Sequence, residues 1–306
     1  MEKKPLGKTG LSVTRLAYGG MELGPVSEAT AVTLLNRVLD EGINYIDTSP
    51  EYANSEYFIG KAISHRRDEY ILATKCCDNM RGNGPMYTFD QKTVLENVEE
   101  SLRLLKTDYI DILQIHGVLP DFLEGGENGE VMETLRELKK SGKILHIGLT
   151  IRNSNPTDYA YPALHGYRNL QTFAAWRDVE VIQVVYGCMT RLSENVIQKA
   201  YDDYGTGIVA RGLLKRYDAT YDARWEASGL QDLLEEGETR NDFLIRYTLT
   251  HPAITAGVCG TRGTEHLVQN VRAALRGPLS ADVYEEAKRR LNYVGAVAGD
   301  VDIWKK

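Results

Sequence analysis

The sequence predicts an α/β protein that folds as one closed (β/α)8 barrel, a TIM barrel, over residues 1–306. Three observations support this class: eight short β-rich segments alternate with amphipathic helical patterns, no linker interrupts the alternation, and several β-rich segments are nearly continuously apolar. Apolar runs such as Val181–Val185 are typical of parallel strands that are buried on both faces. The expected strands are Arg15–Tyr18, Asn44–Asp47, Tyr70–Lys75, Tyr109–His116, Lys143–Thr150, Glu180–Tyr186, Gly207–Ala210 and Thr255–Cys259.

The helical patterns between these strands have recognisable ends. Ser27 is a candidate N-cap for a helix that ends at Gly42. Thr88 and Gln91 have the spacing of a capping box ahead of a second amphipathic helix, whose apolar residues are Val94, Leu95, Val98, Leu102 and Leu105. A doubly wound sheet is the alternative fold, but the residues after Gly19 lack the G-x-G-x-x-G spacing that binds dinucleotides in such sheets.

Four long irregular segments follow predicted strands. In a barrel, segments of this kind lie at the C-terminal face and form the rim of the active site. We therefore expect long substrate loops there. The segments are Asp78–Asp90, Val118–Gly129, Arg152–Asp178 and Leu213–Glu238.

Composition and charge exclude several classes of partner. With 36 Lys+Arg against 43 Asp+Glu, the net charge of -7 argues against nucleic acid or an anionic membrane as partner. The N-terminal segment Met1–Pro5 leads into polar sequence, and no run of about 18 apolar residues occurs, so we expect a cytoplasmic protein. The four cysteines are expected to be reduced and partly buried. Cys and His show no zinc-type spacing, so no metal is expected, and the sequence leaves monomer or homo-oligomer open.

The predicted strand ends carry four residue types that suit carbonyl reduction. Asp47, Lys75 and His116 end three consecutive strands, and Tyr52 follows the first of them. Hydride addition to a carbonyl leaves an alkoxide that needs a proton, but free tyrosine, with a pKa of about 10, is a weak acid at neutral pH. A Lys75 ammonium would lower that pKa, Asp47 would orient Lys75, and His116 would hydrogen-bond the substrate oxygen. Taken singly, each residue also fits a structural role. The combination favours catalysis.

The motifs around these residues resemble those of the aldo-keto reductase family. Gly42–Glu56 followed by Ile59-Gly60 is similar to the family signature, with Asp and Tyr five positions apart. Ala73–Lys75 and Asp108–His116 resemble its lysine and histidine strands, and the resemblance runs from Leu6 to Asn270. It implies hydride transfer from NADPH to an aldehyde or ketone, or the reverse oxidation of an alcohol. Asp47, Tyr52, Lys75 and His116 match the family's catalytic tetrad, with Tyr52 as the general acid.

A cofactor site is expected near the C-terminus. The segment His251–Gly263 reads as a strand and a Gly-rich turn before a helix, where backbone N–H groups and Arg262 suit a phosphate; a capped helix with a surface arginine is the alternative. The resemblance places the adenosine-phosphate site here, and Arg262 with His266 favours NADP(H) over NAD(H). The implied contacts are Gly260, Thr261, Arg262, His266, Gln269 and Asn270.

The nicotinamide end of the implied site departs from the family pattern at two places. Thr150-Ile151 stands where the family usually has Ser-Asn, and Arg211 stands near the position of a stacking aromatic residue. Arg211 is expected to face the pyrophosphate or the substrate, and Gln183 to bond the carboxamide. The implied contacts at this end are Gly20, Met21, Asp47, Thr150, Gln183 and Arg211.

The substrate itself is defined only as a small carbonyl compound or alcohol, with apolar walls expected from residues such as Met80, Met86 and Tyr87. Two other functions remain open. One is an aldolase that uses Lys75 as a Schiff-base amine. The other is a cofactor-bound sensor or partner-binding barrel with slow turnover, or a redox-neutral epimerase or lyase that uses bound nicotinamide transiently.

Overall fold

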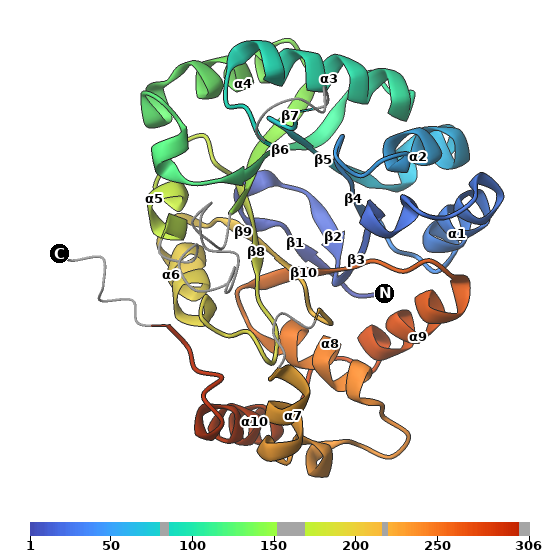
Figure 1. Ribbon diagram of the computed structural model, residues 1–306, viewed down its shortest axis with the longest axis vertical. Helices are drawn as coiled ribbons and strands as arrows, with labels where there is room; N and C mark the ends of the chain where they lie inside the picture. Colours follow the sequence, from blue (N-terminus) through green and yellow to red (C-terminus); the bar gives the residue numbers. More distant parts are fainter. Residues whose placement is uncertain (80–85, 152–168, 216–219, 300–306) are drawn as a thin grey trace.

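The computed structural model describes residues 1–79, 86–151, 169–215 and 220–299. Eight parallel strands close into a barrel in the order β10-β3-β4-β5-β6-β7-β8-β9, and helices ring its outside (Figure 1). The predicted fold class is confirmed, and each predicted strand is present. The strands are β3 (Leu16–Gly19), β4 (Tyr45–Asp47), β5 (Ile71–Cys76), β6 (Ile110–Val118), β7 (Ile144–Ile151), β8 (Val181–Val185), β9 (Gly207–Arg211) and β10 (Ile254–Cys259).

Three helices, α1, α3 and α8, begin at a residue whose side chain accepts a hydrogen bond from a free backbone N–H group. Ser27 caps α1 as predicted, accepting a hydrogen bond from the Thr30 backbone N–H. The predicted capping box of Thr88 and Gln91 is wrong, because the helix starts at Gln91 and Asp90 is its N-cap. The helices are α1 (Glu28–Asp40), α2 (Ser55–Ile63), α3 (Gln91–Leu105), α4 (Glu130–Lys140), α5 (Leu170–Ala174), α6 (Glu194–Tyr204), α7 (Tyr221–Ser228), α8 (Arg240–Thr250), α9 (Thr264–Leu275) and α10 (Ala281–Tyr293).

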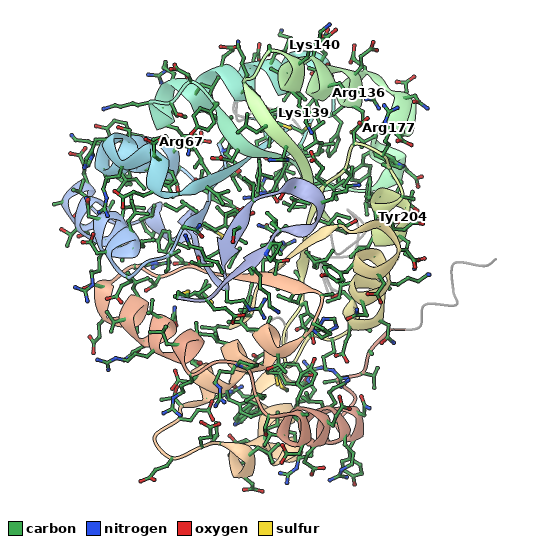
Figure 2. All side chains as sticks on the ribbon, turned by 180° about the vertical axis from the view of Figure 1, so that it is seen from behind. Arg67, Arg136, Lys139, Lys140, Arg177 and Tyr204 are labelled. Atoms are coloured by element: carbon green, nitrogen blue, oxygen red, sulfur yellow. The ribbon has the colours of Figure 1, made fainter. Side chains whose placement is uncertain are left out.

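An antiparallel hairpin of β1 (Lys3–Pro5) and β2 (Ser12–Thr14) precedes the barrel and was not predicted, because three-residue strands carry too little pattern. The view from behind shows it lying across the N-terminal end of the barrel (Figure 2). Leu6 and Val13 are fully buried there and pack with the residues that fill the barrel interior, including Tyr45 and Ile112. This plug closes one end of the barrel, so a site for small molecules opens at the other end.

The long segments after the strands contain more helix than predicted. Helix α5 lies within Arg152–Asp178 and α7 lies within Leu213–Glu238. Residues 80–85, 152–168 and 216–219 of these segments, including Met80, lie outside the described residues. The four cysteines are free and buried, as expected. Within the described part of the chain, no helix combines the length and apolar character needed to cross a bilayer.

Candidate active site

The four predicted catalytic residues meet at the C-terminal end of the barrel. Asp47 is the last residue of β4, Lys75 lies near the end of β5, and His116 lies in β6. Tyr52 lies in the turn between β4 and α2. Parallel strands present their carboxyl ends at one face, which is why residues so far apart in sequence come together.

Asp47 and Lys75 form a buried ion pair. The Lys75 ammonium donates to Asp47 Oδ1 at 2.8 Å and to the Thr48 carbonyl at 2.6 Å, and its side chain is fully buried. The second carboxylate oxygen of Asp47 accepts hydrogen bonds from the side-chain amides of Gln114, at 2.9 Å, and Gln183, at 2.8 Å. Burial acts to lower the pKa of Lys75, but the Asp47 carboxylate outweighs it and raises that pKa.

Tyr52 lies against this ion pair. The Lys75 ammonium is 4.7 Å from the centroid of the Tyr52 ring. Burial raises the pKa of Tyr52 above its ordinary value, while the Lys75 ammonium acts in the opposite direction. Burial therefore outweighs the lowering of the Tyr52 pKa that was expected from the ammonium alone. The phenol is protonated at neutral pH, which is the form that a general acid requires.

His116 belongs to a hydrogen-bonded cluster that the sequence did not reveal. Its Nδ1 lies 2.6 Å from Oδ1 of Asp78, a buried carboxylate just beyond β5. Glu51, Asp78 and His116 offer three potential metal-ligand atoms within 4.8 Å of one another. The distance between His116 Nδ1 and Asp78 Oδ1 is that of a hydrogen bond. The signal available in the sequence was an aspartate three residues after Lys75.

A cavity of about 660 Å³ opens above these residues. This volume lies in the range of small-molecule sites. Met86 and Tyr87 contribute to its wall, as expected. The lining residues that belong to the predicted sites are Met21, Asp47, Tyr52, His116, Thr150, Gln183, Arg211 and Gly260.

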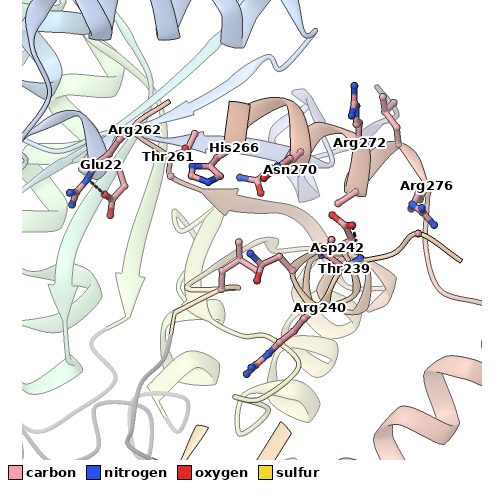
Figure 3. Close-up of a pocket in the computed structure, with 17 residues that line it drawn as sticks. Glu22, Thr239, Arg240, Asp242, Thr261, Arg262, His266, Asn270, Arg272 and Arg276 are labelled. Carbon is pink, nitrogen blue, oxygen red and sulfur yellow. Dashed lines mark hydrogen bonds and ion pairs between the residues drawn. The ribbon is translucent and has the colours of Figure 1, made fainter. Parts of the chain in front are cut away.

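The adjoining cavity, of about 1230 Å³, contains the predicted phosphate-binding residues (Figure 3). The two cavities share the lining residues Glu22, Leu214 and Gly260, so the cavities form one continuous trough. Its far end is cationic. The predicted residues that line it are Gly260, Thr261, Arg262, His266, Gln269 and Asn270, and the further arginines are Arg240, Arg272 and Arg276.

The trough has features that fit a nucleotide. Helix α9 starts after Gly263, whose lack of a side-chain cap leaves the first N–H groups of the helix for an anion. A Cβ atom at Gly260 would lie 3.0 Å from the Gly19 carbonyl oxygen and 2.8 Å from Glu22, so only glycine leaves the floor of the trough open. Arg262, however, donates to the Glu22 carboxylate at 2.7 Å, a contact that joins residues 240 positions apart.

At the end of the trough where the sequence places the nicotinamide, three of the predicted contact residues hydrogen-bond other parts of the protein. The Gln183 amide bonds Asp47, and the Thr150 hydroxyl accepts from the Gly117 N–H at 2.8 Å. Arg211 donates to the Ile151 carbonyl at 3.3 Å, so the two departures from the family pattern contact each other. Gly20 is buried beside Ser55 and, unlike Met21, is not a lining residue of the cavity.

Two relatives of known description are similar in sequence to this chain. The chain is 35% identical to the aldo-keto reductase YhdN of Bacillus subtilis over 70% of its own length and 64% of YhdN. It is 28% identical to the NADH-specific methylglyoxal reductase of Escherichia coli over 67% of its length and 65% of that enzyme. These alignments span just under two thirds of each relative.

The fold and family comparisons extend over more of the chain. The structure of aldo-keto reductase AKR11C1 from Bacillus halodurans in its holo form superposes with a TM-score of 0.80, at 27% identity, and covers 95% of this chain and 96% of that one. A model of the aldo/keto reductase family matches residues 15–291. The chain therefore belongs to the aldo/keto reductase family of oxidoreductase enzymes.

Proposed function

We propose that this protein reduces an aldehyde or ketone with NADPH, or catalyses the reverse oxidation of an alcohol, with Tyr52 as the general acid. The observation that carries the proposal is the buried Asp47–Lys75 ion pair, with its ammonium 4.7 Å from the Tyr52 ring centroid, at the floor of a cavity that His116 also lines. A bound nicotinamide would supply the hydride.

The residues of this chain handle the proton. The substrate oxygen would bind between Tyr52 and His116, and Tyr52 would release its phenolic proton to the alkoxide as charge develops. The resulting phenolate would be stabilised by the Lys75 ammonium, which Asp47 holds in its charged form. The same pairing argues against a Schiff-base aldolase, because an amine must be uncharged to attack a carbonyl.

The choice of NADP(H) rests on the cationic end of the trough. Arg262 and His266 line it together with Arg240, Arg272 and Arg276, and a 2′-phosphate would find guanidinium partners there. The Glu22 carboxylate on Arg262 opposes this preference. The Escherichia coli relative is NADH-specific, so both nucleotides belong in the test.

The test measures nucleotide binding by fluorescence, then carbonyl-dependent oxidation of the bound cofactor across a panel of aldehydes and ketones. Tyr52→Phe is expected to lose at least about a hundredfold in kcat while keeping its affinity for NADPH. Tyr57→Phe, the same change at an exposed tyrosine of α2, serves as the control. Near-normal kcat in Tyr52→Phe would refute the assignment.

Arg262→Gln tests the cofactor preference. We expect the Kd for NADPH to rise about tenfold or more, because a charge-assisted hydrogen bond is lost, while the Kd for NADH changes little. Glu22→Gln should act in the opposite direction by releasing Arg262. Equal effects of Arg262→Gln on both nucleotides would contradict a 2′-phosphate site.

A further inference from the structure

Asp78 is a buried carboxylate that the proposed mechanism does not use. Its Oδ1 lies 2.6 Å from His116 Nδ1, and its Oδ2 accepts hydrogen bonds from the Ser49 hydroxyl and, at 3.3 Å, from the Glu51 backbone N–H. Three donors thus converge on one carboxylate. Both oxygens of the Asp78 carboxylate therefore act as hydrogen-bond acceptors.

The backbone holds this carboxylate in place. Asp78 exchanges two hydrogen bonds with the Asn97 side chain of α3: its N–H donates to Asn97 Oδ1 at 2.9 Å, and its carbonyl accepts from Nδ2 at 3.1 Å. The preceding residue, Cys77, has a φ of 72°, a left-handed conformation that is strained for a residue with a side chain. The chain therefore adopts an unfavourable turn that points Asp78 at His116.

The contact determines which nitrogen of His116 carries a proton. Because the Asp78 oxygen can only accept, the proton lies on Nδ1. In the neutral ring, the other nitrogen, Nε2, then has a lone pair and no proton. To donate a hydrogen bond to a carbonyl oxygen from Nε2, His116 must be an imidazolium.

We propose that Asp78 is a positioning residue that fixes the proton of His116 on Nδ1, so that His116 binds the substrate carbonyl as an imidazolium through Nε2. The proposal rests on the proposed function and deepens it. In the alcohol-oxidising direction, the neutral ring offers Nε2 as acceptor to the alcohol hydroxyl. Tyr52 remains the group that gives or takes the reacting proton.

The groups that face His116 come from several loops. On the Nδ1 side these are Asp78 and the Glu51 carboxylate, whose Oε2 is 3.5 Å away. The Tyr52 ring approaches at right angles with centroids 6.1 Å apart, and the Tyr87 ring lies at 5.0 Å. The ammonium of Lys75 contacts the same Tyr52 ring. Two carboxylates thus face the Nδ1 side of the ring, and the Lys75 charge is paired with Asp47.

The experiment uses histidine labelled with ¹⁵N in the full-length protein saturated with NADP⁺. Long-range ¹H–¹⁵N spectra recorded across pH 5–9 report the protonation of each ring nitrogen, and His116→Gln identifies the resonances of His116. We expect the neutral ring to carry its proton on Nδ1. A neutral His116 with its proton on Nε2 overturns the proposal, whether or not the enzyme is active.

Asp78→Asn provides the second test. The amide group accepts or donates, so both neutral forms of His116 should appear in the ¹⁵N spectra. We expect kcat to fall about tenfold at neutral pH with the KM for the cofactor unchanged. Asp121→Asn, an exposed aspartate on the neighbouring loop, is the matched control. An unchanged tautomer in Asp78→Asn overturns the proposal.

The two hypotheses fail separately. Absence of carbonyl-dependent oxidation in the wild-type protein would refute the proposed function. Under that outcome, an Nδ1–H tautomer that is lost in Asp78→Asn would still establish Asp78 as the residue that positions His116.

Discussion

The ion pair between Asp47 and Lys75 permits a prediction of stability as well as of activity. Asp47→Asn removes the counter-charge from an ammonium that is fully buried, at an Nζ–Oδ1 distance of 2.8 Å. The attraction lost is about 6 kcal/mol at an effective dielectric constant of about 20. Breaking one side of a buried pair typically costs about 3–5 kcal/mol in unfolding free energy, and we expect that range here.

The geometry makes the asparagine a poor replacement. Asp47 accepts from Lys75 at one oxygen and from Gln114 and Gln183 at the other, so both oxygens face donors. The amide nitrogen of an asparagine would meet one of these donors with hydrogens of its own. The substitution therefore removes a charge and also leaves a buried donor unpaired.

Urea denaturation of the nucleotide-free protein measures the cost. Lys75→Met and the double variant complete a double-mutant cycle, in which the double variant should cost at least about 2 kcal/mol less than the two single variants summed. Asp40→Asn is the control, because that carboxylate pairs with Arg66 at 2.9 Å but has 57% of its side chain exposed, so about 0–1 kcal/mol is expected. An Asp47→Asn cost no larger than that of Asp40→Asn, or an additive cycle, would refute the reasoning.

Three further predictions concern pH and packing. Burial raises the pKa of Glu56 to about 7, although the hydrogen bond from Thr74 acts in the opposite direction. The unfolding free energy should therefore fall by about 3 kcal/mol as the pH rises from 4.5 to 7. Urea denaturation at several pH values should show that Glu56→Gln removes this pH dependence. Burial lowers the pKa of His251 to about 4, so stability should fall by about 3 kcal/mol as pH drops from 6.5 to 4, and an unchanged slope in His251→Gln would contradict this. A Cβ at Gly60 would lie 2.0 Å from the Leu104 carbonyl oxygen. Gly60→Ala should therefore lower the unfolding free energy, measured by thermal unfolding, by about 1–3 kcal/mol. An unchanged unfolding free energy would show that α2 and α3 can separate easily.

Much of the fold and of the candidate site could be predicted from the sequence, because both depend on short-range patterns. Runs of apolar residues and their alternation with helical stripes predicted the eight barrel strands. Residues at the ends of parallel strands must meet at one face, so Asp47, Lys75 and His116 could be grouped before any contact was known. The three-residue strands of the hairpin that plugs the barrel carried too little pattern to be recognised.

The tertiary structure alone decided which side chains pair within the site. Gln183, expected to bond the cofactor, bonds Asp47, and Arg262, expected to be available for a phosphate, bonds Glu22 from the opposite end of the chain. Asp78 reaches His116 only because the backbone turns at Cys77. A sequence pattern determines which face of an element is buried, but the partner of a polar side chain depends on strand register and on the path of loops from distant parts of the chain. Local sequence patterns therefore predicted the barrel and the face that carries the candidate site, whereas the packing of the loops set the hydrogen bonds between its side chains.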